Sequence, residues 1–297
     1  MNPFQTLTDR ILASLEAGQA PWHKTWTSGL PASLSTGREY RGINILVLGI
    51  QDFGSRYWVT FKEALRLGGH VRKGEKATQV VYWKWRKPEE LEKANREGRR
   101  LAPCHAFTSH VFNLEQVDGV ARPENDVPHE PHRRLEIADL LVDMMPDKPG
   151  IEHAVRNEPC YDLGNDRVLL PHLSQFEGAE NYYAVLFHEL VHATGHAKRL
   201  NRFTQGAGSR RERYSFEELV AEFGAAFLCA FCGIRIRPVE ELQAAYIAGW
   251  AKVFRKDPKV LLRAASAAQN AADYIRGKRT FVESGAEAAE TSVPAIS

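Results

Sequence analysis

Apolar positions along the chain recur at two spacings, one typical of helices and one typical of strands. Over residues 179–194 they recur every three to four residues, which predicts a helix, and Gly195 follows as its expected stop. A second apolar helix is predicted at about residues 215–231. The same spacing predicts further helices at residues 4–17, 45–51, 61–67 (with Thr60 as cap), 134–145, 240–254 and 258–274.

Alternation of apolar and polar residues predicts strands in both halves of the chain. Residues 79–85 alternate in this way, and residues 105–113 are the expected antiparallel partner. Between them, residues 87–100 are highly charged, which predicts an exposed insertion or hairpin arm. Shorter strands are predicted at residues 57–59, 151–156, 160–162 and 167–170. Helices and strands in both halves predict an α+β fold.

One stretch, residues 118–131, is rich in proline and polar residues and shows no hydrophobic period. This composition predicts a linker. It would join a small, basic α+β domain at residues 1–117 to a second α+β domain at residues 132–283. Residues 284–297 are rich in Ala, Glu, Ser, Thr and Pro and are predicted to be a disordered tail.

The composition narrows the class of protein. At 297 residues the chain is long enough for two domains, and it contains no run of about eighteen apolar residues that would predict a membrane span. The N-terminus lacks the basic and apolar segments of a secretory signal. The four cysteines are dispersed, and Cys229 and Cys232 end an apolar helix, where core packing explains them better than a redox or metal role. We therefore expect a cytoplasmic protein without a membrane partner.

Positive charge and tryptophan are concentrated toward the N-terminus. Residues 1–88 contain 13 Lys and Arg against 6 Asp and Glu, although the whole chain carries only +2, and five of the six tryptophans lie there. Cations neutralise phosphates and aromatic rings stack on unpaired bases, so this pattern favours binding of single-stranded nucleic acid without sequence specificity. The residues expected to contact DNA are Lys24, Trp26, Arg38, Tyr40, Arg41, Lys73 and Lys76.

Core packing is the other explanation for the tryptophans. It accounts for Trp58 and Trp83 at least as well as base stacking does, since these side chains can form the core of a small domain. Trp22 and Trp26 lie in a turn-rich segment instead, and we expect these two side chains to be exposed.

The predicted helix at residues 179–194 contains His188-Glu189-Leu190-Val191-His192, an H-E-x-x-H motif. Histidines four residues apart project from one face of a helix, where both can bind a single Zn²⁺ ion. Glu189 lies between them, placed to take a proton from a water molecule. A purely structural His-Glu-His cluster is the alternative, but a buried carboxylate without a partner is strongly unfavourable. The motif therefore predicts a metal site, with Zn²⁺ expected and Mn²⁺ or Co²⁺ as alternatives.

A zinc site of this type needs a third protein ligand. The extended motif H-E-x-x-H-x-x-G-x-x-H matches through Gly195 and fails at Lys198, and His196 falls two residues too early. The second predicted helix offers Glu218 and Glu222, four residues apart on one face. We expect Glu218 to be the third ligand and Glu222 to orient a ligand histidine, with Glu222 or another residue as the alternative ligand. Two histidines and a glutamate form the thermolysin-like, gluzincin-type ligand set.

Glu218 also has an explanation that involves no metal. Ser215 and Glu218 have the spacing of a capping box, and Tyr214 and Leu219 have that of a hydrophobic staple. A helix start would then account for Glu218, but not for Glu222, which falls inside the apolar run.

These residues predict a peptide hydrolase. A zinc ion with an open position lowers the pKa of a water molecule toward about 7. Glu189 would take the proton as the water attacks a peptide carbonyl and would pass it to the leaving amine. Tyr214, His196 and His172 are candidates to stabilise the oxyanion. Two other classes stay open: a DNA-occluding protein whose metallopeptidase fold is catalytically dispensable, and, less favoured, a metal-dependent nuclease.

Consecutive motifs in the first 115 residues resemble one known family. They are Pro21-Trp22 with Trp26, Thr36-Gly37-Arg38-x-Tyr40-Arg41-Gly42-Ile43-Asn44, Trp58-x-Thr60-Phe61-Lys62-x-Ala64, Leu67-Gly68-Gly69-x-Val71-Arg72-Lys73-Gly74-Glu75-Lys76 and Val80-Val81-Tyr82. Together they resemble the single-stranded-DNA-binding domain of the ArdC antirestriction family, a module that also precedes some plasmid primases.

The second half of the chain resembles the zincin-like metallopeptidase domain that accompanies this module in the family. The resemblance rests on the H-E-x-x-H motif and on Glu217-Glu218-Leu219-Val220-Ala221-Glu222. It covers nearly the whole chain, and it implies a plasmid- or phage-borne protein that enters a new host cell and protects incoming DNA from restriction. It also implies single-stranded DNA as a partner, and it leaves room for a protein substrate in the recipient cell.

Overall fold

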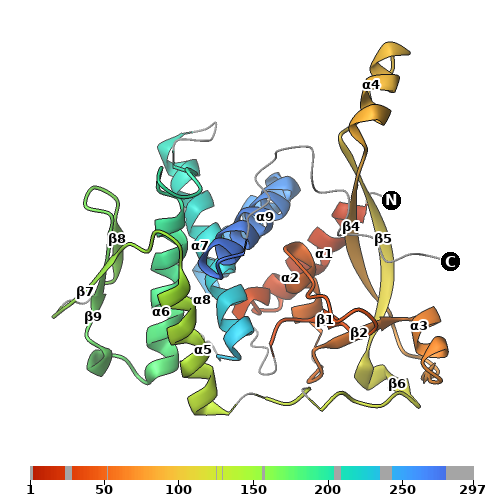
Figure 1. Cartoon of the computed structure of the whole chain (residues 1–297), viewed down its shortest axis with the longest axis horizontal. Helices are drawn as coiled ribbons and strands as arrows, with labels where there is room; N and C mark the ends of the chain where they lie inside the picture. The colour runs from red at the N-terminus through yellow and green to blue at the C-terminus, as the bar shows by residue number, and fades with distance from the viewer. Residues whose placement is uncertain are drawn as a thin grey trace.

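The N-terminal half of the molecule combines short helices with a mixed four-stranded sheet. The computed structural model describes residues 3–23, 29–51, 53–124, 126–128, 130–155, 158–203, 209–234 and 243–278 of the chain (Figure 1). The sheet order is β1 (Ala32–Ser33), β2 (Tyr57–Thr60), β5 (Cys104–Asn113) and β4 (Thr78–Trp85), with β1 parallel to β2 and the other pairs antiparallel. Around it lie α1 (Pro3–Glu16), the 3₁₀ turn η1 (Pro21–His23), α2 (Ile43–Gly49), α3 (Phe61–Arg66) and the 3₁₀ turn η2 (Leu114–Gln116).

Strands β4 and β5 form the hairpin that the alternating pattern predicts. Tyr82 lies opposite Phe107 and Trp83 lies opposite Ala106 in the antiparallel register. The hairpin extends away from the body of the molecule and carries α4 (Pro88–Arg96) at its tip, so the predicted exposed arm is confirmed (Figure 1). At its base, Thr60 caps α3 in a capping box with Glu63, as predicted. A short pair of strands, β3 (His70–Val71) and β6 (Val117–Asp118), lies beside α3.

The second half places a small sheet beside a bundle of helices (Figure 1). The sheet order is β7 (Gly150–Ala154), β9 (Arg167–Pro171) and β8 (Cys160–Asp162), with β7 parallel and β8 antiparallel to β9. Its helices are α5 (Pro131–Met144), α6 (Ala179–Thr194), α7 (Arg210–Cys232), α8 (Gln243–Lys256) and α9 (Pro258–Ile275), with the 3₁₀ turn η3 (Leu173–Gln175) before α6. In the described part of the chain, no helix is both long and apolar enough to span a membrane.

One difference from the predicted elements is the start of α7. The apolar pattern predicts a helix from about Ser215, whereas the observed helix begins at Arg210. Its first turn is made of charged residues, so hydrophobic spacing carries no signal for it. Ser215 therefore lies inside the helix, and the predicted capping box of Ser215 with Glu218 is wrong.

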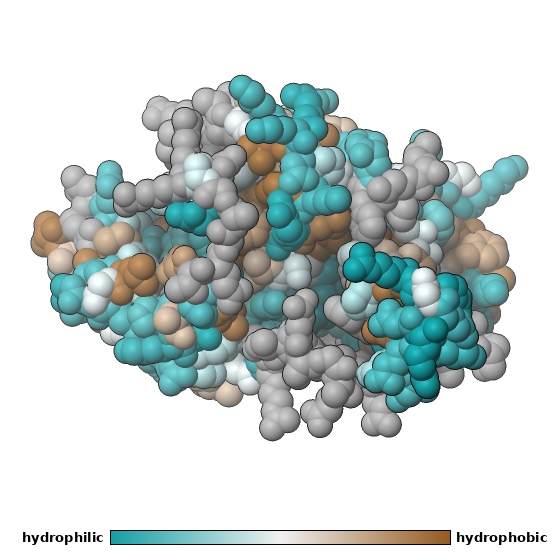
Figure 2. Space-filling view, turned by 90° about the horizontal axis from the view of Figure 1, so that it is seen from above, coloured by the Kyte–Doolittle hydropathy of each residue, from teal (hydrophilic) through white to brown (hydrophobic). Residues whose placement is uncertain are grey.

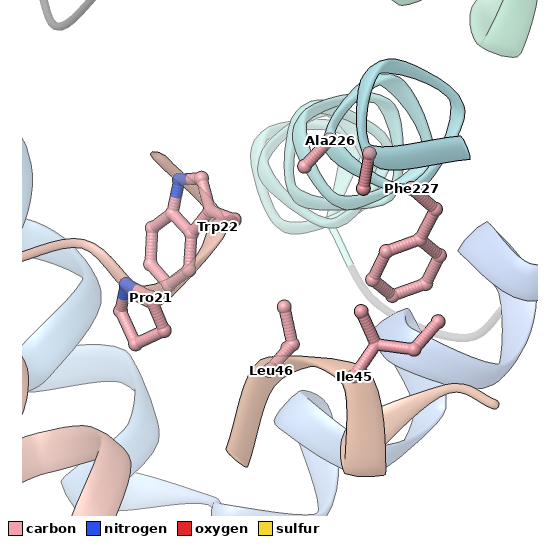
Figure 3. A pocket seen from close by; sticks show the side chains of 7 residues that line it. Pro21, Trp22, Ile45, Leu46, Ala226 and Phe227 are labelled. Atoms are coloured by element: carbon pink, nitrogen blue, oxygen red, sulfur yellow. The ribbon is translucent and has the colours of Figure 1, made fainter. Parts of the chain in front are cut away.

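One hydrophobic core joins the two halves of the chain. It contains Leu7 and Ile11 of α1 and Leu46 of α2 together with Phe223 of α7 and Phe254 of α8. Figure 3 shows one contact between the two halves, where Trp22 and the α2 residues Ile45 and Leu46 face Ala226 and Phe227 of α7 around a small cavity. The packing is therefore continuous across the linker predicted at residues 118–131, and the division into domains stays a prediction from composition.

This shared core corrects one expectation about the tryptophans. Trp22 is 1% exposed, and its ring centroid lies 4.9 Å from that of Phe223. The expectation that Trp22 is exposed is wrong because its contact is some two hundred residues away in the chain, where local turn signals contain no information. Trp58 is fully buried, as the core explanation requires, while Trp83 is 45% exposed.

Polar contacts tie the loop before α2 to the end of α9. Arg276 donates two hydrogen bonds of 3.0 Å each to the carboxylate of Glu39, and Lys278 adds a third at 3.2 Å. Arg41 pairs with the buried Asp273, and the backbone N–H of Gly42 donates to Gln269. The C-terminal helix therefore clamps the Thr36–Asn44 motif of the N-terminal half.

The stretch predicted as a linker is also held at one point. Asp126 is 1% exposed, and its carboxylate accepts hydrogen bonds from the hydroxyl of Ser55 at 2.5 Å and from the backbone N–H of Arg56 at 3.0 Å. Arg122 pairs with the same carboxylate. The chain therefore leaves the N-terminal half from a fixed position.

We predict that Glu39→Gln lowers the free energy of unfolding by about 2–4 kcal/mol at pH 7, because the largely buried Arg276 loses its counter-charge. Burial would raise the pKa of Glu39, but the hydrogen bonds and charges of Arg276 and Lys278 outweigh burial and lower it from 4.5. The stabilisation is therefore present above pH 4.5 and is lost as the pH falls through the lowered folded-state pKa.

Urea unfolding of wild type and variant as a function of pH measures this difference. Glu136→Gln is the matched control, since Glu136 pairs with Arg133 on the exposed face of α5, and we expect it to change stability by less than about 0.5 kcal/mol. A difference between Glu39→Gln and wild type that persists unchanged below pH 4 would contradict the assignment.

Candidate functional site

Helix α6 presents its two motif histidines to a partly open face. The helix spans Ala179–Thr194 as predicted, with Gly195 at its C-terminal cap. Leu186, Leu190 and Val191 are buried in the core, which fixes the rotation of the helix. The side chains of His188 and His192 keep 22% and 14% of their surface exposed, so solvent reaches both rings.

Glu218 of α7 completes a group of three potential metal ligands. Its two carboxylate oxygens lie 3.6 Å from Nε2 of His188 and 3.5 Å from Nε2 of His192, and the two Nε2 atoms are 3.1 Å apart. Among the described residues this group brings three ligand atoms within 4.8 Å of one another. Ligand atoms on a tetrahedral zinc ion, at about 2.1 Å each, lie about 3.4 Å from one another. The residues present therefore fit a metal ion.

Burial and neighbouring charges shift the pKa values of the three potential ligands. Burial and the neighbouring His188 lower the pKa of His192 to about 4, so its ring is neutral near pH 7. Burial alone would lower the pKa of His188 as well, but the hydrogen bond with Glu218 and the charges of Glu222 and Glu189 outweigh it and raise the pKa. The pKa of Glu218 is lowered, because its contacts with both histidines exceed the effect of burial. A carboxylate and a neutral imidazole are the forms that bind metals.

The other residues expected at the site are also close to it. Glu189 is 6% exposed, and its charge acts on His188 and on Tyr214. Glu222 lies one turn after Glu218 on α7, and its charge acts on both histidines. Both carboxylates therefore lie near the histidines, and their roles as general base and orienting carboxylate stay predictions.

The three oxyanion candidates differ in their surroundings. Tyr214 is 67% exposed and hydrogen-bonds to Glu218, so it lies beside the ligand group with most of its surface in solvent. His172 stacks on His153, with ring centroids 6.3 Å apart, and the Nδ1 atom of His196 accepts from the backbone N–H of Lys198. Of the three, Tyr214 has a contact with the metal-ligand group.

The separation of the two helices is set by a glycine. A Cβ atom added at Gly224 of α7 would lie 2.7 Å from Cγ2 of Val191 on α6, well inside van der Waals contact. Gly224 makes that contact, while Ala226 lines the small cavity beside Trp22 on another side of α7.

Arg202 locks the two helices together, and no sequence signal points to it. Its guanidinium donates to the hydroxyl of Thr194 at 2.7 Å and to the backbone carbonyl of Val191 at 2.9 Å, both on α6. It also pairs with Glu217 of α7 at 3.1 Å. Capping the end of α6 with a cation complements the helix dipole, and the pair with Glu217 places the neighbouring Glu218.

A second arginine ties the same end of α6 to the small sheet. Arg199 is almost fully buried and donates to the backbone carbonyl of Ala193 at 2.6 Å and to the hydroxyl of Tyr161 at 3.1 Å. It also pairs with Asp166 in the β8–β9 turn. Burial would raise the pKa of Asp166, but the hydrogen bonds from Arg199 and Tyr161 lower it well below its usual range.

The residues predicted to contact DNA differ in their exposure to solvent. Arg38, Lys73 and Lys76 are exposed, as such contacts require. Tyr40 is only 7% exposed and packs on Tyr82, so its ring is not open to a base, contrary to the expectation. Arg41 is half exposed but is held by Asp273. Lys24 and Trp26 lie outside the described residues.

Comparison with protein families matches the two halves of the chain separately. Residues 1–112 match the N-terminal domain of anti-restriction factor ArdC. Residues 143–267 match a zincin-like metallopeptidase family.

Relatives from two bacteria align with almost the whole chain. A DNA primase TraC of Escherichia coli is 33% identical over 294 residues, which cover 92% of this chain and 27% of the primase. A second Escherichia coli TraC is 34% identical, and 20% of its length is covered. The chain thus spans about a quarter or less of these primases. Protein y4eC of Sinorhizobium fredii is 32% identical, with 92% of its length covered.

Solved structures of one protein share the fold. The metal-free crystal structure of the antirestriction ArdC protein from plasmid R388 superposes with a TM-score of 0.73 at 34% identity, covering 93% of this chain and 97% of that one. The Mn(II)-bound structure of the same protein gives a TM-score of 0.72 at 33% identity, with coverage of 93% and 98%.

We predict that Glu218→Gln weakens binding of Zn²⁺ or Mn²⁺ by at least about 100-fold, because it removes an anionic ligand, whereas Glu222→Gln weakens it by about tenfold. Isothermal titration calorimetry of the full chain measures both. Equal losses, or a larger loss for Glu222→Gln, would make Glu222 the third ligand.

We predict that Gly224→Ala destabilises the protein by about 1–3 kcal/mol, because the added methyl group forces α6 away from α7. Val191→Ala should partly rescue it in the double variant, and this rescue is measured by urea unfolding. Gly249→Ala in α8 is the matched control, since its Cβ atom meets nothing within 4 Å. It should stabilise by roughly 0.5–1 kcal/mol, and absence of rescue would mean that Val191 does not set the helix separation.

Proposed function

The chain belongs to the ArdC antirestriction family, and from this membership we propose that it protects DNA that enters a new host cell by binding single-stranded DNA without sequence specificity. We propose further that it carries a zinc-dependent, metallopeptidase-like site. The observation that supports the metal site is the convergence of His188, His192 and Glu218 at tetrahedral spacing.

Positive charge and similarity to named relatives support the proposed binding of single-stranded DNA. Residues 1–88 have an excess of seven positive charges, and Arg38, Lys73 and Lys76 of that region are exposed. Relatives that share this region include proteins named as DNA primases, which handle DNA. Phosphate contacts of this kind give an affinity that falls with salt and does not depend on base sequence.

The residues of the metal site allow a hydrolytic mechanism. A Zn²⁺ ion held by His188, His192 and Glu218 would lower the pKa of a water molecule toward about 7. Glu189 accepts the proton of the attacking water and passes it to the leaving amine. Tyr214, which is exposed beside Glu218, donates a hydrogen bond to the developing oxyanion. A protein of the recipient cell is the proposed substrate.

A second candidate is a DNA-occluding protein in which hydrolysis is dispensable. It is favoured by the shared core of the two halves, because the metal-site helix α7 also forms the surface on which the N-terminal half packs. In that case the metal site stabilises the fold rather than cutting a substrate. For the same reason, truncation after the N-terminal half would expose core residues, and point substitutions test the roles more cleanly.

We predict that Glu189→Gln leaves the affinity for Zn²⁺ and for single-stranded DNA within about threefold of wild type, because in this proposal Glu189 is neither a metal ligand nor part of the basic region. The rate of any peptide hydrolysis should fall by about 100-fold or more, because the general base is lost. Calorimetry and fluorescence anisotropy measure the two affinities. Transfer of an unmethylated plasmid into a restricting strain measures antirestriction.

The plasmid-transfer result separates the two candidates. Protection that falls to the level of the empty vector in Glu189→Gln would assign antirestriction to hydrolysis. Protection that persists would assign it to DNA binding alone. A wild-type protein that binds none of Zn²⁺, Mn²⁺ and Co²⁺ would overturn the metal site itself.

A further inference from the structure

The β4–β5 arm leaves the sheet after its first residues. Strand β2 pairs with β5 only at Val111, Phe112 and Asn113, whereas β4 pairs with β5 from Val111 outward to Cys104. The base of the arm is covered, since Val80 and Val81 are buried and the Asn44 side chain hydrogen-bonds to both backbone polar groups of Val81. Beyond Val81 only two strands pair. Tyr82 and Ala106 still pack against the core, but a two-stranded ribbon has few neighbours that can bury its other side chains.

Two large aromatic side chains are exposed on this ribbon. Trp83 is 45% and Phe107 is 44% exposed. Tyr82 pairs with Phe107 and Trp83 pairs with Ala106 in adjacent positions of the register, so Trp83 and Phe107 lie on opposite faces. Stacking on Tyr82 at 5.5 Å explains one side of the Phe107 ring. Nearly half of the surface of each of these two side chains is exposed to solvent, and a base can stack on such a surface.

Charge along the arm is divided between stem and tip. The stem, defined as residues 78–87 and 100–110, contains four Lys and Arg and no Asp or Glu. Lys84 and Lys87 are exposed, and Lys84 lies directly opposite the exposed His105. The four glutamates of the arm lie at its tip, in and just after α4. Seen from above, hydrophilic residues gather densely at the right of the molecule, where the tip of the arm comes toward the viewer (Figure 2).

The stem of the arm combines exposed cations with exposed aromatic rings, and this combination favours one kind of ligand. An acidic peptide would satisfy the cations but would leave the rings exposed, and an apolar partner would leave the cations unpaired. Single-stranded DNA offers both a phosphate backbone and unpaired bases that stack on aromatic rings. The exposed Lys73 and Lys76 precede β4 at the base of the stem and extend the same positive track.

We propose that single-stranded DNA wraps around the stem of the arm, with bases stacked on Phe107 on one face and on Trp83 on the other, and with phosphates paired with Lys84 and Lys87. This inference rests on the proposed function, and it adds the place where the DNA lies. It also assigns the stacking role to rings of the β-ribbon, in place of the buried Tyr40.

The test is fluorescence anisotropy of a labelled oligo-dT of about 20 nucleotides with the full-length protein, over a series of salt concentrations. Trp83→Ala and Phe107→Ala should each weaken binding about tenfold, since each removes one stacked base. Trp83→Phe keeps a ring and should stay within about threefold of wild type. Lys84→Gln should make the salt slope shallower by about 0.7, the contribution of one phosphate contact.

Controls separate this inference from a loss of structure and from the proposed function. Phe61→Ala removes an exposed ring on α3, outside the arm, and should change affinity by less than about twofold. Circular dichroism and thermal unfolding verify that each variant folds. Polyglutamate should compete poorly with the DNA, because it carries charge without bases.

Three outcomes would contradict either the position of the DNA site on the arm or the proposed DNA binding itself. If wild type binds and the arm variants bind equally well, the stem is not the DNA site and the proposed function stands. If Phe61→Ala weakens binding as much as Phe107→Ala, or if polyglutamate displaces the DNA fully, stacking on the arm is wrong. If wild type binds no single-stranded DNA at any salt concentration, the DNA-binding part of the proposed function fails.

Discussion

The close packing of α6 against α7 is the constraint on which the rest of the molecule depends. The candidate metal site brings His188, His192 and Glu218 from two helices within 3.1–3.6 Å of one another, and such distances tolerate little movement. Gly224 lets the helices approach, and Arg202 holds the end of α6 against Glu217. A packed interior has few alternative arrangements, so these contacts define the site before any metal binds.

Helix α7 serves the two halves of the molecule at once. One side carries Glu218 to the histidines of α6, and another packs on Trp22 and α2 of the N-terminal half. At the far end of the bundle, α9 holds Glu39 and Arg41 through Arg276 and Asp273. The basic half and the metal half therefore share their stability, and a substitution in one is expected to reach the other through α7 and α9.

Local patterns predicted much of this structure. The α6 helix with its H-E-x-x-H motif, the β4–β5 hairpin and the Thr60 cap follow from spacing alone. The errors had two causes, which were contacts distant in sequence and a helix start without a hydrophobic pattern. Trp22 was expected to be exposed because its partner Phe223 is far along the chain, and the capping box at Ser215 failed because a charged first turn extends α7 without a hydrophobic signal. Arg202 and Gly224 have no local signature, since their roles exist only where two helices meet.

The sequence by itself determined which chemistry is available: two imidazoles one turn apart, a carboxylate between them, a glutamate pair on a second helix, and a basic, aromatic N-terminal region. These are short-range properties, set by helical geometry and composition. The tertiary structure decided that Glu218 faces the histidines, that Tyr40 and Trp22 are buried, and that Trp83 and Phe107 stay exposed on the arm. Burial and ligand distance depend on which elements pack together, and packing is set by the whole chain rather than by any segment of it.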